Sequence, residues 1–493
     1  EPIFDSDHTS VVFSNNVSSD ITYTANAGTF TFARAGIYHI VLVAHTQQET
    51  SNQLQTFEMK LNSASAFYVG ERQVNTGYDP VESTHQAVVS ISADDVLHIQ
   101  MKTASATATV IQGTSVIITE ITSGHYASHQ ATAAGTNTNI DEFNPFDTNY
   151  SGNPASYTTV TAGMTVTATD GSFTVNSAGR YFIMVSNSFV MADQGGGAST
   201  ILMKLKKGGS AISSQTVAAV IGDDIAENTF CQIENLAATD VMTFTWDTSD
   251  ATEEDGVRAQ KGTTFTIYKL SEASYTNGTT AGFFGYPYIS LYNIETDFTA
   301  TAAEVNPFTT GAYDSANSFS TRAADGITFT AADGKFTVSE PGLYNIIFAP
   351  VFSLSTGADV VTKIKVNGTT QVTSTGKVSS DPDPLDKTTI AFLELNKNDF
   401  VTVTVDCDGQ NLDCDTGTSI AIYRYFGFSK TEDTLPSGLI SNDLTINTFS
   451  QENLSVQHER NTDQVPFRFG IKGAASLRGR TEAPVVKIGD KKS

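Results

Sequence analysis

A stretch of alternating apolar and polar residues occurs three times along the chain. It reads GTFTFARAGIYHIVLVA at 28–44, GSFTVNSAGRYFIMVSN at 171–187 and GKFTVSEPGLYNIIFAP at 334–350. Phe30 and Phe32 share one face of the first copy, and this period of two is typical of a β-strand. In each copy a second Gly follows eight residues after the first, and a Tyr two residues later. The pattern predicts two strands joined by a tight turn, repeated in three domains.

Further landmarks recur in the same order in each copy. A Pro-aromatic motif precedes the stretch, a charged strand with an aligned lysine follows it, and a strand that starts with Gly-Thr closes the copy. The closing strands read GTSVIITEI at 113–121, GTTFTIYKL at 262–270 and GTSIAIYRY at 417–425. Short strands bounded by Gly, Asn, Asp and Ser are typical of antiparallel sandwiches, so each copy is predicted to form one two-sheet domain.

The repeats divide the 493 residues into domains and connections. We expect a first domain at 1–125, a linker at 126–143, a second domain at 144–270, an aromatic-rich linker at 271–304, a third domain at 305–429 and an extended basic C-terminal arm at 430–493. The aromatic run GFFGYPYISLYNI at 282–294 either covers an edge strand of its own domain or forms an inter-chain strap or ligand surface. We favour the first interpretation.

The order of these motifs resembles a known family. The G-x-F-T turn, the Gly and Tyr at fixed spacing and the closing G-T-x-[FVI] strand are similar to the globular head of complement component one, subcomponent q, one of the tumour-necrosis-factor-like jelly rolls. The family's Pro, five residues after the first Gly, is replaced by Ala33, Asn176 and Ser339. The resemblance implies an all-β chain of three tandem antiparallel jelly-roll β-sandwich domains, which pack as trimers with an apolar inner sheet near the axis.

The apolar pattern requires a neighbour for one face of these domains. In LYNIIFAPVF at 343–352 neither face of the strand is polar, so one face covers the core and the other packs against another domain. Three identical chains could stack three trimers, or one chain could fold its own repeats into a pseudo-trimer. We favour the homotrimer, in which the main partner of the chain is itself.

Charge separates the body from the tail. The formal net charge of −25 argues against binding to nucleic acid or an anionic membrane, and no apolar run approaches the ~20 residues of a membrane helix. From Glu459 onward eight basic and four acidic residues give 8 − 4 = +4, which leaves −25 − 4 = −29 elsewhere. The tail is either solvated or, as we favour, an arm that docks on acidic neighbours. Its candidate anchoring residues are Arg468, Lys472, Arg478 and Arg480.

One acidic loop is the candidate for metal binding, because calcium prefers several oxygen ligands. Its possible ligands are Asp406, Asp408, Asp413 and Asp415. Solvated acidic side chains are the simpler interpretation of the same loop. Cys407 and Cys414 flank DGQNLD at 408–413 within this loop and could form a disulfide, with two unpaired thiols as the favoured alternative.

Sequence motifs of catalysis are missing: there is no G-x-S-x-G, phosphate-binding loop or dinucleotide fingerprint. Seven of the eight histidines lie between His8 and His129, but without an HExxH or Cys-His pattern. We therefore expect a non-enzymatic virion surface protein, a capsid decoration or attachment fibre that binds host glycan or protein. The alternative is a secreted or cell-surface microbial adhesin. The chain starts at Glu1 without a signal-peptide pattern, so either a leader was removed or the sequence starts late.

Overall fold

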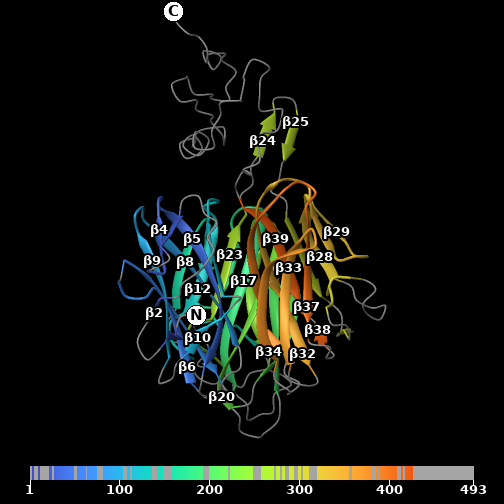
Figure 1. The fold of residues 1–493 in the computed structure, drawn as a ribbon. Helices are drawn as coiled ribbons and strands as arrows, with labels where there is room; N and C mark the ends of the chain where they lie inside the picture. Colours follow the sequence, from blue (N-terminus) through green and yellow to red (C-terminus); the bar gives the residue numbers. More distant parts are fainter. Residues whose placement is uncertain are drawn as a thin grey trace, which may run out of the picture.

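The computed structural model shows an all-β protein, and the residues that it describes contain no helix. The predicted fold class is confirmed. Three lobes, one for each sequence repeat, lie side by side in Figure 1, with repeat 1 in blue, repeat 2 in green and repeat 3 in orange. The described residues are 3–4, 9–10, 21–24, 27–48, 53–62, 64–74, 81–103, 108–111, 114–135, 142–147, 157–191, 199–219, 222–247, 257–270, 274–277, 280–283, 288–293, 298–300, 304–309, 319–354, 358–378, 385–386, 388–407, 412–414 and 417–425.

Each repeat is a sandwich of two antiparallel sheets, which we call inner and outer because residues of the inner sheets meet at the centre of the molecule. In repeat 1 the inner strands are β1 (Ile3–Phe4), β5 (Gly36–Gln48), β8 (Val81–Ile91), β10 (Ala108–Val110) and β11 (Ser115–Glu120). Its outer strands are β2 (Thr9–Ser10), β3 (Ile21–Thr24), β4 (Thr29–Phe32), β6 (Gln53–Leu61), β7 (Tyr68–Val74) and β9 (Val96–Thr103).

Repeat 2 follows the same plan with one described strand more in its inner sheet. The inner strands are β12 (Tyr126–Ala131), β14 (Tyr157–Ala162), β17 (Gly179–Met191), β20 (Gly222–Leu236), β22 (Val257–Ala259) and β23 (Thr264–Lys269). The outer strands are β13 (Glu142–Phe143), β15 (Met164–Thr167), β16 (Ser172–Val175), β18 (Ser199–Lys207), β19 (Ser210–Ala219) and β21 (Val241–Asp247). Neighbouring strands are mostly distant in sequence, as in a jelly roll.

Repeat 3 repeats this plan and adds a small third sheet. Its inner strands are β26 (Tyr288–Asn293), β28 (Phe319–Asp325), β31 (Gly342–Ala349), β36 (Thr389–Leu395) and β39 (Ser419–Tyr425). Its outer strands are β29 (Ile327–Thr330), β30 (Lys335–Val338), β33 (Ala358–Val366), β34 (Thr369–Val378) and β37 (Phe400–Asp406). The small sheet contains β27 (Phe298–Ala300), β32 (Val351–Leu354), β35 (Leu385–Asp386) and β38 (Leu412–Cys414), and the hairpin β24 (Ser274–Asn277) and β25 (Thr280–Phe283) stands apart in Figure 1.

The repeated motif is a structural element of each lobe. Its first Gly adopts a positive φ of 60 to 62° in all three copies, which favours glycine at the turn. The hydroxyl of its Tyr donates to the carbonyl oxygen four residues earlier, at 3.1 Å for Tyr38, 2.6 Å for Tyr181 and 2.7 Å for Tyr344. The second Gly leaves room for a long side chain of the closing strand: a Cβ at Gly342 would come within 2.4 Å of Arg424 Nε. The motif therefore forms the turn between an outer and an inner strand and makes room for the closing strand beside it.

Both predicted linkers contribute strands to the sheets. Strand β12 lies between β14 and β23 in repeat 2, although the sequence placed 126–143 in a linker. Strand β26 pairs with β28 and β39 in repeat 3, so part of the aromatic run at 282–294 lies in its own domain, in a central strand and not as a cover on an edge. The sequence pattern did not reveal these strands, because each strand precedes the Pro-aromatic motif that marked the start of its repeat.

The three repeats of one chain share a buried core. It contains Val41 of repeat 1, Met184 of repeat 2 and Ile347 of repeat 3, which occupy matching positions in their strands and are each at most 2% exposed. The closing strand of each repeat contacts another repeat: β23 contacts β8, β39 contacts β20 and β11 contacts β36. The structure thus has the pseudo-trimer, the arrangement that the sequence left as the alternative to stacked homotrimers. The apolar faces that a homotrimer needs are already covered within the chain.

Candidate functional site between the repeats

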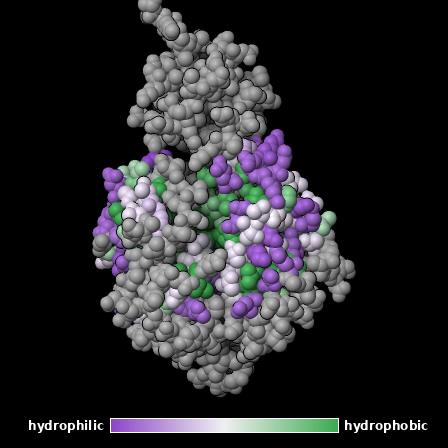
Figure 2. Space-filling model, in the orientation of Figure 1, coloured by the Kyte–Doolittle hydropathy of each residue, from purple (hydrophilic) through white to green (hydrophobic). Residues whose placement is uncertain are grey.

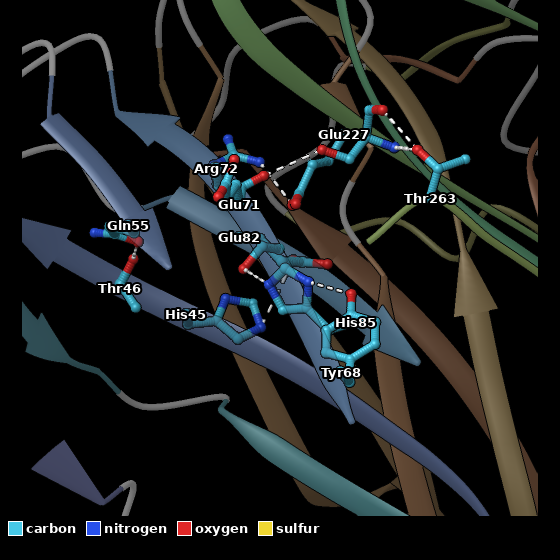
Figure 3. A network of polar contacts seen from close by, with 12 residues as sticks. His45, Thr46, Gln55, Tyr68, Glu71, Arg72, Glu82, His85, Glu227 and Thr263 are labelled. Atoms are coloured by element: carbon cyan, nitrogen blue, oxygen red, sulfur yellow. Dashed lines mark hydrogen bonds and ion pairs between the residues drawn. The ribbon is translucent and has the colours of Figure 1, made fainter. Parts of the chain in front are cut away.

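Buried polar side chains gather where repeat 1 meets repeat 2. Strands β5, β7 and β8 supply most of them, and β6, β20 and the turn before β23 supply others (Figure 3). Polar groups in an interior are stable only when they are hydrogen-bonded or paired with opposite charge. We call this cluster, which lies between two repeats, the interlobe network.

Tyr68 and His85 form the centre of the interlobe network. The Tyr68 hydroxyl lies 2.9 Å from His85 Nδ1, and His85 Nε2 lies 3.0 Å from the Ser83 hydroxyl. Burial, and then the nearby Arg72, lower the pKa of His85 to about 3. Burial, and then Glu227, raise the pKa of Tyr68 well above its usual value. Both side chains are therefore neutral near pH 7, so both contacts of His85 are hydrogen bonds between neutral groups.

Two ion pairs join repeat 1 to repeat 2 beside this centre. Arg72 lies 3.4 Å from Glu227, with side chains 13% and 6% exposed, and Lys261 lies 3.1 Å from Glu71. The Ser188 hydroxyl also donates to the Glu71 carbonyl at 3.1 Å. Because the Arg72–Glu227 pair is largely buried, losing one partner leaves a charge in a poorly solvated place.

A third contact brings repeat 3 to the same region. His45 Nε2 lies 3.6 Å from a Glu82 carboxylate oxygen and 3.1 Å from the Ser374 hydroxyl of repeat 3. The side chains of His45 and Glu82 are 0% and 5% exposed. Residues of repeat 1 thus make polar contacts with both other lobes.

Polar contacts also cross the shared core. The Tyr268 and Tyr423 hydroxyls lie 2.8 Å apart, and Asn345 Nδ2 donates to the Tyr423 hydroxyl at 2.7 Å. His39 Nε2 lies 2.9 Å from Gln86 Oε1, and the Gln86 amide donates to the Met184 carbonyl of repeat 2 at 3.1 Å. Burial lowers the pKa of His39 to about 4, against the opposing effect of the Gln86 hydrogen bond.

This chemistry connects lobes and does not face solvent. Tyr68 and His85 are at most 1% exposed, so no substrate reaches them without separation of the repeats. Within the described ranges, no group of three or more His, Cys, Asp or Glu residues is arranged to hold a metal ion. The interlobe network can orient the repeats and respond to protonation, and these are the roles that its geometry supports.

The predicted calcium loop lies mostly outside the described residues. Asp406 ends β37, and Cys407 beside it is buried at 1% exposure in the core of repeat 3. Asp408 and Asp415, and the side chains of Asp413 and Cys414, are not among the described residues. The calcium site and the Cys407–Cys414 disulfide therefore stay predictions. The arm residues Arg468, Lys472, Arg478 and Arg480 also lie outside the described part of the chain.

The concentration of histidines near the start of the chain is the sequence signal for the interlobe network. No sequence signal marks its ion pairs. Histidines concentrate between His8 and His129, and three of them, His39, His45 and His85, lie at contacts between lobes. The ion pairs had no signal, because Arg72 and Glu227 are 155 residues apart and come from different repeats. Arg72 and Glu227 come together only because the folded repeats pack against each other.

Comparisons with known proteins give weak similarities. No protein-family model matches the chain, and no curated protein matches it. Among solved structures, Eiger TNF from S. frugiperda is 11% identical and covers 30% of this chain and 99% of its own, with a TM-score of 0.23. Murine APRIL, at pH 5.0 and at pH 8.0, is 13% identical and covers 28% of this chain and 98% of its own, with a TM-score of 0.21. The described residues include no helix able to span a membrane.

Proposed function

We propose that the protein is a non-enzymatic structural protein of a virion surface, a capsid decoration or attachment knob that its basic arm anchors. The observation that carries the proposal is the core shared by three repeats of different sequence, which makes one chain a rigid three-lobed unit. The interlobe network is buried between lobes. Such a body suits attachment and support.

The charge distribution supports an arrangement in which the arm faces the particle and the body faces solvent. Hydrophilic residues gather on the described outer surface of the lobes in Figure 2, and the body carries a formal charge of −29 against +4 from Glu459 onward. A basic arm can approach an acidic neighbour on the particle, while the acidic body stays solvated and repels similar bodies. The outer loops of the lobes are then free to meet host glycan or protein.

Particle association tests this proposal. Replacing Arg468, Lys472, Arg478 and Arg480 by Gln should release the protein from purified particles, measured by sedimentation and immunoblotting, because the arm loses four of the eight positive charges that follow Glu459. Replacing Arg468, Arg478 and Arg480 by Lys, which keeps all four charges, is the matched control and should leave it bound. We also expect that raising the salt concentration from 0.1 M to 1 M releases the wild-type protein, because the Debye length falls from about 10 Å to about 3 Å.

Two outcomes would contradict this proposal, the first its charge anchoring and the second its virion role. The Gln variant could stay on the particle, which would exclude charge anchoring. The protein could instead be found on or around cells and never with particles, which would favour a secreted or cell-surface adhesin built from the same lobes.

A further inference from the structure

His129 is a buried histidine of repeat 2 that does not belong to the interlobe network. It lies on β12 and is 2% exposed. Its Nδ1 lies 2.8 Å from the Thr159 hydroxyl of β14, whereas its Nε2 is buried and has no hydrogen-bond partner among the described residues. A buried polar atom without a partner costs free energy, so this nitrogen calls for an explanation.

Aromatic rings enclose the imidazole of this histidine. It stacks on Phe173 of β16, with ring centroids 4.8 Å apart, and on Phe146, with centroids 5.9 Å apart. Tyr157 of β14 meets it edge-on at 6.3 Å. On β23, the residue opposite His129 is Phe265, which is 0% exposed. The surroundings are those of a hydrophobic core, and they suit an uncharged ring.

The groups that titrate near this ring do not favour a charge on it. Among the described residues of the elements packed against His129, Tyr157 is the titratable group in contact with its ring, and Asp147 acts on that tyrosine. Burial, and then Asp147, raise the pKa of Tyr157, so its hydroxyl stays neutral and donates to the Pro145 carbonyl. Burial lowers the pKa of His129 to about 4. The imidazole is therefore neutral near pH 7.

Repeat 3 has an apolar residue at the matching position. Strand β26 lies between β28 and β39 as β12 lies between β14 and β23, with Tyr288 opposite Tyr423 as Tyr126 is opposite Tyr268. Leu291 is the fourth residue of β26, as His129 is of β12, and it is 0% exposed in the core of its lobe. The fold thus accepts leucine at this place, and repeat 2 has a titratable group there instead.

Strands β12 and β14 join the rest of their sheet along one edge. Among the described strands, β14 pairs with β12, and β12 connects this pair to β23. Strand β12 also contacts β8 of repeat 1, and Tyr126 at its start lies in the shared core. Proteins open locally in contiguous structural units before they unfold as a whole. Detachment of this strand pair from β23 brings His129 into water and loosens the boundary between repeats 1 and 2.

We propose that His129 is a proton sensor: its protonation detaches the β12–β14 strand pair from β23 and weakens the contact of repeat 2 with repeat 1, while the other strands stay folded. An imidazolium enclosed by Phe146 and Phe173 loses most of its hydration, whereas in the detached pair water solvates it. Acid therefore favours the detached state. This response is independent of the virion role, because it needs neither the basic arm nor a particle.

Hydrogen exchange of the full chain at pH 7 and pH 5 tests the proposal. Protection factors are compared, because they remove the intrinsic effect of pH on amide exchange. A histidine with a pKa of about 4 in the closed pair and about 6.5 in the detached pair makes detachment about twentyfold more frequent at pH 5 than at pH 7. The protection of β12 and β14 should fall by this factor. Strands β26 and β28, which have Leu291 in place of the histidine, should keep theirs.

Two variants assign the fall in protection to one histidine. His129→Leu, which installs the residue of repeat 3, should fold and should abolish the fall in β12 and β14. His125→Leu makes the same change at a partly exposed histidine just before β12 and should keep it. Three outcomes would overturn the proposal: no fall in the wild-type protein, an equal fall in β26 and β28, or a fall that persists in His129→Leu.

Discussion

Residues at matching positions of the three lobes have diverged where the lobes meet. His39 of repeat 1, Phe182 of repeat 2 and Asn345 of repeat 3 take the same place in β5, β17 and β31, and all are at most 2% exposed. His39 and Phe182 rings lie 6.0 Å apart, while Asn345 donates to Tyr423. A homotrimer would place three copies of one residue there. One chain can place three different residues that complement each other.

Acid should destabilise the protein through its buried histidines. Burial lowers the pKa of His39 and His129 to about 4 and that of His85 to about 3, while unfolded histidine titrates near 6.5. Between pH 6.5 and 4 the unfolded state therefore binds more protons, so the free energy of unfolding falls as pH falls. Each histidine contributes up to about 1.4 kcal/mol per pH unit. Urea unfolding at pH 7 and pH 5 measures this slope.

Variants test whether the histidines cause this dependence of the free energy of unfolding on pH. His39→Asn, which installs the residue of repeat 3, should reduce the dependence of unfolding free energy on pH. Val41→Ala lowers stability in the same core without removing a titrating group, and it should keep the wild-type slope. An unchanged slope in His39→Asn would show that this histidine is not buried neutral.

The buried ion pair should matter far more than an exposed one. Arg72→Met should lower the free energy of unfolding by about 3 kcal/mol, because it leaves the Glu227 carboxylate in a poorly solvated place. The exposed pair of Lys335 and Asp333, with side chains 37% and 41% exposed, is the control, and Lys335→Met should change it by less than about 1 kcal/mol. Denaturant melts compare the two, and equal effects would contradict the buried role of Arg72.

At the scale of elements, the closing strand is where lobes touch. The Gly of its Gly-Thr start has a φ of 92° in Gly262 and 107° in Gly417. A Cβ on Gly262 would lie 2.8 Å from Gly70 Cα of repeat 1, and one on Gly417 would lie 2.4 Å from Gln215 Cγ of repeat 2. The motif thus marks close approach between neighbouring repeats as well as a turn.

Substitutions at two glycines with positive φ distinguish the backbone strain of a turn from the close approach of two repeats. Gly262→Ala should lower the free energy of unfolding by about 1 to 3 kcal/mol more than Gly208→Ala, because both acquire backbone strain but only Gly262 forces repeats 1 and 2 apart. Gly208 has a φ of 56° and no atom within 4 Å of an added Cβ. Thermal or urea unfolding measures the difference. Equal losses would mean that repeat 1 does not approach Gly262.

At the scale of the whole molecule, the shared core makes the chain its own trimer. Val41, Met184 and Ile347 are buried by neighbouring repeats and not by another chain. The full chain should therefore have the mass of a monomer, 52.6 kDa, in mass photometry, and not three times that mass. Isolated repeat 2 should associate or aggregate, because it exposes its core face. A full chain of three times the monomer mass would contradict this arrangement.

The sequence by itself determined the lobes. Alternation, the turn glycines such as Gly28 and the spacing to Tyr38 are local properties of short strands, so the all-β class, the three repeats and their motif could be read without coordinates. The same local information failed for β12 and β26, since a strand that begins a repeat has no landmark before it. The apolar pattern at 343–352 also predicted that one face of this strand packs against a neighbour.

Only the tertiary structure decided what that neighbour is. Whether Ile347 meets its own copy or Met184 depends on the direction in which each connection leaves β11 and β23, and alternation carries no such information. The Arg72–Glu227 and His45–Ser374 contacts join residues 155 and 329 positions apart, so no pattern along the chain marks them.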